Sequence, residues 1–264
     1  MNSTSDTSKK ISRRTAIKRV GFTVAGLAAA TAGIRYASSK KEIIKSSNDT
    51  FSHKNFTKMK VLLINGSPHK NGCTHTALTE VAAALQKNGV DTELLWLDLQ
   101  PISGCRGCGS CRATGKCIVD DVVNQVIARA DQYDGLIVGS PVHYAGASGF
   151  VTSFMDRLFY AGSRRFVGKP GAAIVSCRRA GSTAALEQLN KYFTINNMPL
   201  VSSQYWNMVH GNTPDEVRQD LEGMQTMRTL GQNMAWLLQC IAAGKAAGIA
   251  LPTYENRVGT NFIR

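Results

Sequence analysis

The stretch KVLLINGSPHKNGCT at residues 60–74 decides how this chain folds. Its first part, 60–65, is a short apolar run typical of a buried parallel strand. The second part, 66–74, is rich in Gly, Ser and Thr, and a helix is expected over 76–87 because apolar residues recur at helical spacing, at Leu78, Val81, Ala82 and Leu85. A strand, a polar turn and a helix in this order predict the first unit of an α/β domain.

The turn at 66–74 is also suited to bind an anion. Backbone N–H groups and the helix dipole favour a phosphate at a helix N-terminus, and the hydroxyls of Ser67 and Thr74 can donate to phosphate oxygens. The turn lacks the glycine patterns of Walker and dinucleotide-binding loops, so the sequence favours a monophosphate. An ordinary turn with a polar cap is the alternative. The candidate phosphate-binding residues are Ser67, His69, Lys70, Asn71, Gly72, Cys73 and Thr74.

Strands and helices then alternate along the rest of the chain. Further strands are predicted over 91–97, 135–140, 171–176 and within 199–209, and further helices over 121–130, 149–160, 183–193 and 214–243. This alternation predicts an α/β fold with a doubly wound parallel sheet of five strands and helices on both faces. Ligands of such folds bind at the carboxyl ends of the strands.

Three loops are expected to meet at that edge of the sheet, at 66–74, 140–146 and 176–182. A phosphate at a helix N-terminus, with a flat ring between two further loops, is the arrangement that an FMN site needs. The second and third loops supply the candidate cofactor-binding residues Pro141, Val142, His143, Tyr144, Arg178 and Arg179. The catalytic residues are not defined by the sequence, and the candidates are His143, Tyr144 and Arg178.

Four of the seven cysteines form the run C-x2-C-x2-C-x5-C within the loop 104–121, at Cys105, Cys108, Cys111 and Cys117. Bacterial ferredoxins hold iron–sulfur clusters with a similar run, so a 4Fe–4S cluster is the favoured interpretation. Redox-active thiols, disulfides and zinc are the alternatives, and zinc usually takes two C-x2-C pairs set farther apart. Because the loop follows the second strand, the cluster is expected at the carboxyl edge of the sheet, near the FMN.

Together these motifs resemble the flavodoxin-like NADPH-dependent FMN reductase family, and more closely the iron–sulfur flavoproteins within it. The matching pieces are VLLINGSPHKNGCT from Val61, the cysteine run with Asp120 and Asp121 after it, GSPVHY at 139–144, and the segments 197–199 and 204–211. The resemblance covers residues 60–264. It implies a flavodoxin-like sheet of strand order 2-1-3-4-5 and FMN held by the loops 66–74 and 140–144. It also implies a cluster in those members that carry one, and a homodimer or homotetramer.

The resemblance also implies an FMN-dependent oxidoreductase. Its electrons would come from NAD(P)H or another donor and pass to a small acceptor such as a quinone. One alternative is an electron-carrier flavoprotein that serves a protein partner. Another is a thiol-redox or metal-binding module with a degenerate flavin site.

The N-terminal residues differ in composition from the rest. Residues 1–57 hold 11 Lys and Arg against 3 Asp and Glu, so most of the net charge of +13 lies there and does not predict nucleic-acid binding. The pair Arg13 and Arg14 precedes a weakly hydrophobic run at 21–34, which resembles a twin-arginine export signal. We therefore expect a signal peptide or anchor at 1–37, a linker at 38–58 and the folded FMN-binding domain at 59–264.

This leader predicts a periplasmic or other extracytoplasmic protein. A membrane contact is expected only through the leader, if it is not cleaved. Because NAD(P)H is not expected outside the cytoplasm, a membrane quinol, a cytochrome or another redox protein is an alternative electron donor.

Overall fold

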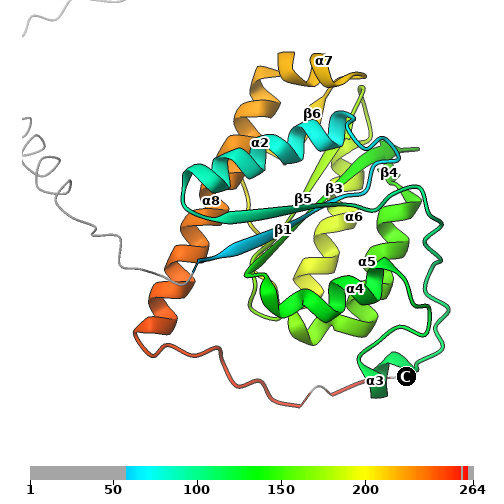
Figure 1. The fold of residues 1–264 in the computed structure, drawn as a ribbon, viewed down its shortest axis with the longest axis vertical. Coiled ribbons are helices and arrows are strands. Elements are labelled where there is room, and N and C mark those ends of the chain that lie inside the picture. Colours follow the sequence, from blue (N-terminus) through cyan, green and yellow to red (C-terminus); the bar gives the residue numbers. More distant parts are fainter. Residues whose placement is uncertain (1–57, 257, 261–264) are drawn as a thin grey trace, which may run out of the picture. The chain divides into compact units, whose positions relative to one another are not determined.

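The computed structural model describes residues 58–256 and 258–260, so the predicted leader and nearly all of the linker lie outside the described residues. The described chain contains a parallel sheet in the order β2-β1-β3-β5-β6 (Figure 1). The strands are β1 (Lys60–Asn65), β2 (Asp91–Trp96), β3 (Gly135–His143), β5 (Gly171–Cys177) and β6 (Met208–His210). Counting the parallel strands along the chain, this is the order 2-1-3-4-5, so the predicted flavodoxin-like fold is confirmed.

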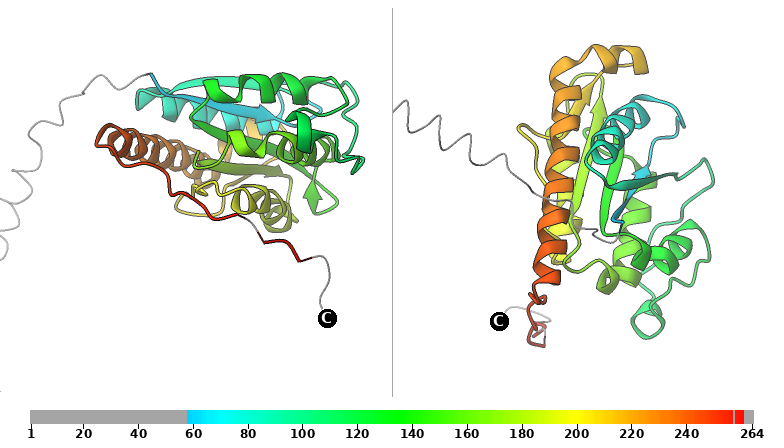
Figure 2. Two further views of the ribbon diagram at one scale, coloured as in Figure 1. Left: turned by 90° about the horizontal axis from the view of Figure 1, so that it is seen from below. Right: turned by 60° about the vertical axis from the view of Figure 1, so that its left-hand side comes forward.

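Helices cover both faces of this sheet (Figures 1 and 2). One face carries α2 (Cys73–Lys87) and the long α8 (Leu221–Ala246). The other carries α4 (Val122–Arg129), α5 (Gly149–Gly162) and α6 (Ser182–Ile195). Since both faces are covered, the strands are expected to be apolar on both sides, which explains their continuous hydrophobic runs.

Strand β1 shows how one apolar run serves two cores. Leu62 and Ile64 pack into the core beneath α4, α5 and α6, whereas Val61 and Leu63 pack into the core beneath α2 and α8. The two-residue period of a strand sends alternate side chains to opposite faces of the sheet. All four are fully buried, because helices cover both faces. Truncating any one of them to Ala is expected to cost about 2–5 kcal/mol of stability.

The C-terminal third differs from the prediction in two places. The strand expected within 199–209 is only Met208–His210, with one isolated bridge between Leu200 and Gly171 before it. The helix expected over 214–243 is two helices, α7 (Pro214–Gln219) and α8, because Asp220 between them leaves the helical conformation. The Asp220 carboxylate accepts hydrogen bonds from the N–H groups of Gly223 and His210, so it caps α8 and ties it to β6.

Two smaller elements lie near the predicted functional loops. Strand β4 (Gly146–Ala147) forms an antiparallel hairpin with the end of β3, and the short helix α3 (Cys111–Thr114) interrupts the cysteine loop. Within the described part of the chain, no helix has both the length and the apolar character needed to cross a membrane.

Candidate functional site

The loop after β1 is shaped by a buried asparagine that was not predicted as a site residue. Asn65 is 0% exposed; its Oδ1 accepts the N–H of Ser67 at 3.1 Å, and its Nδ2 donates to the carbonyl of Lys70 at 2.9 Å. Ser67 Oγ in turn accepts the N–H of His69 at 3.1 Å. These bonds fold the loop back on itself and leave His69, Lys70 and Asn71 exposed. A polar residue at the end of an apolar strand was the available sequence signal.

Helix α2 begins directly after this loop without a side-chain cap. Its N-cap residue is Gly72, and among the described residues no side chain bonds to the N–H groups of its first turn. These groups are therefore available to an anion. The hydroxyl of Thr74 already has a partner within the protein, because Thr74 is 1% exposed and its Oγ1 lies 2.8 Å from Ser176 Oγ. Ser67 is thus the better candidate for a hydroxyl contact with phosphate.

Trp96, at the end of β2, is a further residue of this loop that was not predicted. Its indole Nε1 donates to the carbonyl of Ser67 at 2.8 Å. The ammonium group of Lys70 lies 5.5 Å from the centre of the indole ring, within range of a cation–π interaction. The interaction holds one positive charge beside the candidate phosphate site.

The second loop, predicted at 140–146, is mostly a tight β-hairpin. Strand β3 continues through Pro141 and Val142 to His143, and β4 begins at Gly146. The two residues between them, Tyr144 and Ala145, have φ values of 49° and 60°, the left-handed pair of a type I′ turn. Such turns favour Asn and Gly, so this one is strained. The ring of Tyr144 is fully exposed at its tip.

Buried hydroxyls and one close contact tie the three predicted loops together. Ser148 Oγ donates to the carbonyl of Gly66 at 3.0 Å, and the Ser148 N–H donates to Ser140 Oγ at 2.9 Å. The third loop reaches the hairpin at Gly181, where an added Cβ would lie 2.6 Å from Ala145 Cα. With the Thr74–Ser176 contact, these bonds confirm that the three loops meet. Arg178 and Arg179 are exposed on the third loop.

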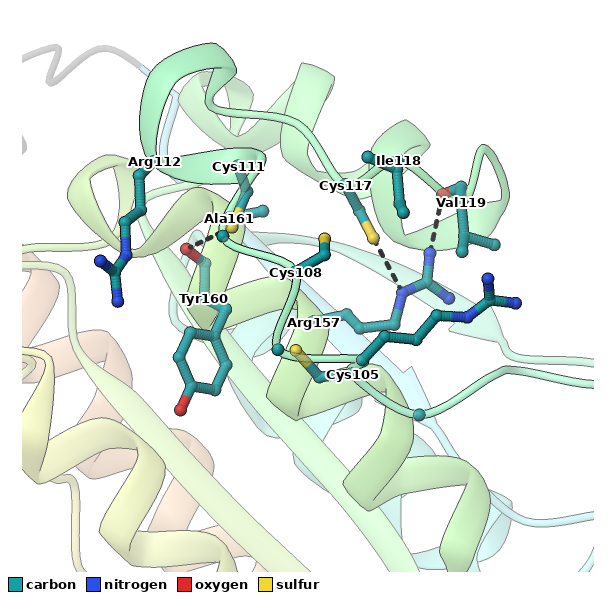
Figure 3. Close-up of a pocket in the computed structure, with 14 residues that line it drawn as sticks. Cys105, Cys108, Cys111, Arg112, Cys117, Ile118, Val119, Arg157, Tyr160 and Ala161 are labelled. Carbon is teal, nitrogen blue, oxygen red and sulfur yellow. Dashed lines mark hydrogen bonds between the residues drawn. The ribbon is translucent and has the colours of Figure 1, made fainter.

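The four cysteines of the loop line one pocket, together with Arg157, Tyr160 and Ala161 of α5 (Figure 3). All four carry free thiols; Cys105 and Cys108 are exposed, and Cys111 and Cys117 are half-buried. Hydrogen bonds from Ser110 lower the pKa of the Cys108 thiol. In the described part of the chain, no three Cys, His, Asp or Glu side chains are as close as metal ligands. Four thiols in one pocket are the type of donor that soft metal centres prefer.

This pocket is not at the carboxyl edge of the sheet, where it was expected. The loop starts at that edge after β2 but runs along α5, and Cys111 Sγ contacts the carbonyl of Tyr160 at 3.4 Å, near the end of that helix. Because a helix rises about 1.5 Å per residue, Tyr160 lies about 18 Å along α5 from Ser148. In Figure 1, α3 lies at the lower right of the domain and β4 lies well above it. Packing of the loop against α5 overrides the position of the strand that precedes it.

The family comparison agrees with the FMN site that the sequence predicts at the three loops 66–74, 140–146 and 176–182, which are called the flavin loops from here on. The family described as NADPH-dependent FMN reductase matches residues 59–213, which span β1 to the start of α7. The chain belongs to this family. Two similar proteins are iron–sulfur flavoproteins by name. One, from Methanocaldococcus jannaschii, is 30% identical over 196 residues, covering 69% of this chain and 99% of the relative. The other, from Methanosarcina thermophila, is 24% identical over 187 residues, covering 69% and 97%.

Solved structures with this fold are more distant from the chain in sequence. RosB, determined with a bound riboflavin-phosphate derivative, superposes with a TM-score of 0.55 at 12% identity, over 77% of this chain and 92% of RosB. A flavone reductase superposes with a TM-score of 0.56 at 16% identity, over 69% and 64% of the two chains. At these identities the likeness concerns the fold alone.

As a member of the NADPH-dependent FMN reductase family, the chain is a flavin-dependent oxidoreductase. The family supports FMN as the cofactor, and the loops fit it. They combine an uncapped helix N-terminus for the phosphate, a hairpin that presents Tyr144, and two exposed arginines on the third loop. The family match ends at residue 213 and includes the cysteine run.

Proposed function

We propose that this protein is an FMN-dependent oxidoreductase whose four loop cysteines hold a second redox centre, a 4Fe–4S cluster. The observation that carries this proposal is that four free thiols line one pocket in a member of a flavin reductase family. The named relatives are iron–sulfur flavoproteins, which supports an iron–sulfur centre in this chain. Zinc and redox-active thiols are the competing interpretations of the pocket.

The residues at the carboxyl edge would hold FMN, which supplies transfer of electrons singly or in pairs when it is bound. The N–H groups of the first turn of α2 and the Ser67 hydroxyl would bind the phosphate, with Lys70 beside them. The hairpin with His143 and Tyr144 would border the ring. Arg178 and Arg179 would place positive charge at the third loop, where it can stabilise a reduced, anionic ring or orient an acidic or carbonyl-bearing substrate.

Cys105, Cys108, Cys111 and Cys117 would provide the thiolates of the cluster, which supplies one-electron transfer when it is bound. Tyr160 and Ala161 of α5 would form the wall of the pocket behind it. The loop itself contains the glycines Gly107 and Gly109 in left-handed conformations, which give it the backbone freedom to close around a centre.

A small acceptor such as a quinone is the proposed final substrate, and NAD(P)H or another reduced carrier is the proposed donor. A second candidate function is electron transfer to a protein partner. It is favoured by the position of the cysteine pocket, which is open to solvent at Cys105 and Cys108 and lies away from the flavin loops. We further propose a homodimer or homotetramer, which light scattering of the purified protein would test.

Export through the twin-arginine route is proposed from the sequence alone. This route carries folded, cofactor-loaded proteins, which suits an enzyme that assembles flavin and iron in the cytoplasm. Replacing Arg13 and Arg14 by Lys keeps the charge but removes the recognised pair. Fractionation should then find the doubly substituted protein in the cytoplasm, and efficient export of that variant would contradict the signal.

Anaerobic purification followed by measurement of flavin, iron and acid-labile sulfide tests the central proposal. FMN with iron and sulfide in matched amounts would support it. Zinc without sulfide would replace the cluster by a zinc site, and a protein without flavin but with titratable thiols would favour the thiol-redox module. Turnover with small quinones then separates an enzyme from a carrier that reacts only with another protein.

A further inference from the structure

We propose that Arg157 is a positioning residue for the centre on the four cysteines, holding Cys117 through an N–H···S hydrogen bond and closing the base of the loop. This inference rests on the proposed function, because it concerns the same pocket. Arg157 lies on α5 and is 1% exposed, although arginine is rarely buried without a specific partner.

Every donor of the guanidinium has a partner. A guanidinium carries five N–H groups, one on Nε and two on each terminal nitrogen. Nε donates to Cys117 Sγ at 3.2 Å. Nη1 donates to Asp121 Oδ2 at 2.5 Å and to the carbonyl of Ser103 at 3.4 Å. Nη2 donates to Asp121 Oδ1 at 2.9 Å and to the carbonyl of Val119 at 2.8 Å. All the N–H groups of this buried guanidinium therefore donate to residues of the segment 103–121.

These bonds join both ends of that loop. Ser103 precedes the first cysteine, whereas Val119 and Asp121 follow the last one, so Arg157 closes the intervening segment at its base. Asp121 is itself fixed, because its Oδ1 also accepts the N–H of Val123 and caps α4. The two-pronged pairing with Asp121 is the strongest type of side-chain hydrogen bond between an arginine and a carboxylate.

Cys117 is also held by hydrogen bonds of its own backbone. Its backbone N–H donates to Asn124 Oδ1 at 2.9 Å, and its carbonyl accepts from Asn124 Nδ2 at 2.9 Å. Its sulfur receives the Arg157 N–H. Cys105 and Cys108 lie in an exposed stretch between glycines. Cys117 is therefore the fixed ligand onto which the others close when a centre binds.

The bond to sulfur separates this role from a purely structural one. A structural clamp needs only the bonds to Asp121 and to the two carbonyls. An N–H directed at a ligating sulfur withdraws negative charge from it, and hydrogen bonds to the sulfurs are among the factors that set the potential of an iron–sulfur centre. A positive group beside the ligand is expected to favour the reduced centre and so to raise its midpoint potential.

The test compares Arg157→Lys, Arg157→Gln and Asp121→Asn with wild type after anaerobic reconstitution. Arg165, whose pairing with Asp131 is largely exposed, gives the matched control Arg165→Gln. The readouts are iron and sulfide per chain, FMN per chain, unfolding temperature, and the midpoint potential from a redox titration followed by electron paramagnetic resonance.

We expect Arg157→Lys to keep the charge and most of the iron but to lower the midpoint potential, because lysine cannot pair with Asp121 and bond to the sulfur together. A tenfold change in the one-electron equilibrium would appear as about 59 mV. Arg157→Gln should lose most of the iron and sulfide and keep its FMN. Asp121→Asn should lower the unfolding temperature while leaving the potential nearer to that of wild type. Arg165→Gln should match wild type throughout.

Iron content and potential that are unchanged in Arg157→Lys and Arg157→Gln would overturn the role of Arg157 and leave the proposed cluster intact. Wild-type protein that binds FMN but no iron and sulfide would overturn the cluster, and the role of Arg157 with it. If Arg157→Gln does not fold, Arg157→Lys alone decides, since its ammonium group preserves the pairing with Asp121.

Discussion

The flavin loops and the cysteine loop differ in how much of their geometry exists before a cofactor binds. The flavin loops are joined by buried groups, since Asn65, Thr74 and Ser148 are at most 1% exposed and all bond to other parts of the site. The cysteine loop is mostly exposed, and its buried anchor is Arg157 of α5.

This difference bears on the conformational entropy that each site loses when it is ordered. In the flavin loops, folding of the sheet already fixes the backbone, so FMN binds to groups in place. The cysteine loop is mostly exposed, and ordering an exposed segment costs about 1–2 kcal/mol per residue. If the four thiols hold the proposed centre, its binding would offset that cost, so the centre and the order of the loop are expected to form together.

The largest effect is expected from removing a cysteine ligand. Replacing Cys105, Cys108, Cys111 or Cys117 by Ala should abolish most of the iron and sulfide while leaving most of the FMN, because the two sites share no residue. Cys240→Ala is the control, since that thiol is exposed on α8 away from the pocket. Parallel assays of iron, sulfide and flavin measure the outcome. Loss of FMN together with iron in all four variants would contradict two separable sites.

The next largest effect is expected where the third flavin loop meets the hairpin. Gly181 has φ of 86°, and a Cβ there would lie 2.6 Å from Ala145 Cα, which is backbone and cannot rotate away. Gly181→Ala should therefore destabilise the protein by about 2–4 kcal/mol and weaken FMN binding. Gly89→Ala is a matched control, because Gly89 has φ of 78° but open space around its Cα. Equal unfolding free energies for both variants would mean that the loop contact carries no stability.

Two hydroxyls of the flavin loops are expected to separate binding from stability. Ser67→Ala should weaken FMN binding by about 1.5–3 kcal/mol, the range for a hydrogen bond to a charged group, and should also lower the stability of the FMN-free protein by about 1 kcal/mol, because Ser67 Oγ accepts the N–H of His69. Thr74→Ala should lower stability by about 1 kcal/mol, because it leaves buried Ser176 without its partner, but should leave FMN binding nearly unchanged. Flavin titration and thermal unfolding of the FMN-free protein measure the two effects. Identical profiles would show that the two hydroxyls share one role.

Much of this comparison could be predicted from the sequence, and the reasons are local. The strand, turn and helix at 60–87 follow from hydrophobic period and turn composition, and the cysteine run follows from spacing alone. The convergence of three loops then follows from the general rule for parallel sheets.

The rest depends on contacts between distant parts of the chain. Arg157 lies 36 residues from Asp121 and 40 from Cys117, so no local pattern joins them. A signal was nevertheless present, because Arg157 falls on the buried face of α5 with Phe154 and Leu158, and a charge on such a face needs a partner. The shift of the cysteine pocket along α5 and the hairpin at Tyr144 depend on packing and turn geometry that composition does not encode.

The smallest effect is expected in the alkylation rates of two thiols, one from each region, in the metal-free protein. Hydrogen bonds from Ser110 lower the pKa of Cys108, whereas burial raises the pKa of Cys73, whose thiol contacts the carbonyl of Gly211. The thiolate is the reactive form, so the group with the lower pKa has the larger reactive fraction near neutral pH. Cys108 should therefore be alkylated by iodoacetamide several-fold faster than Cys73.

The difference should narrow as the pH rises past the ordinary thiol value of 9.0, because Cys108, whose pKa is lowered, has less thiolate left to gain there than Cys73, whose pKa is raised. Mass spectrometry of peptides taken at successive times gives both rates in one experiment, and Cys240 provides an exposed reference thiol. Faster reaction at Cys73 near neutral pH would mean that the N-terminus of α2 activates this thiol despite its burial. Of the two thiols compared, the one in the flavin loops would then be the more reactive.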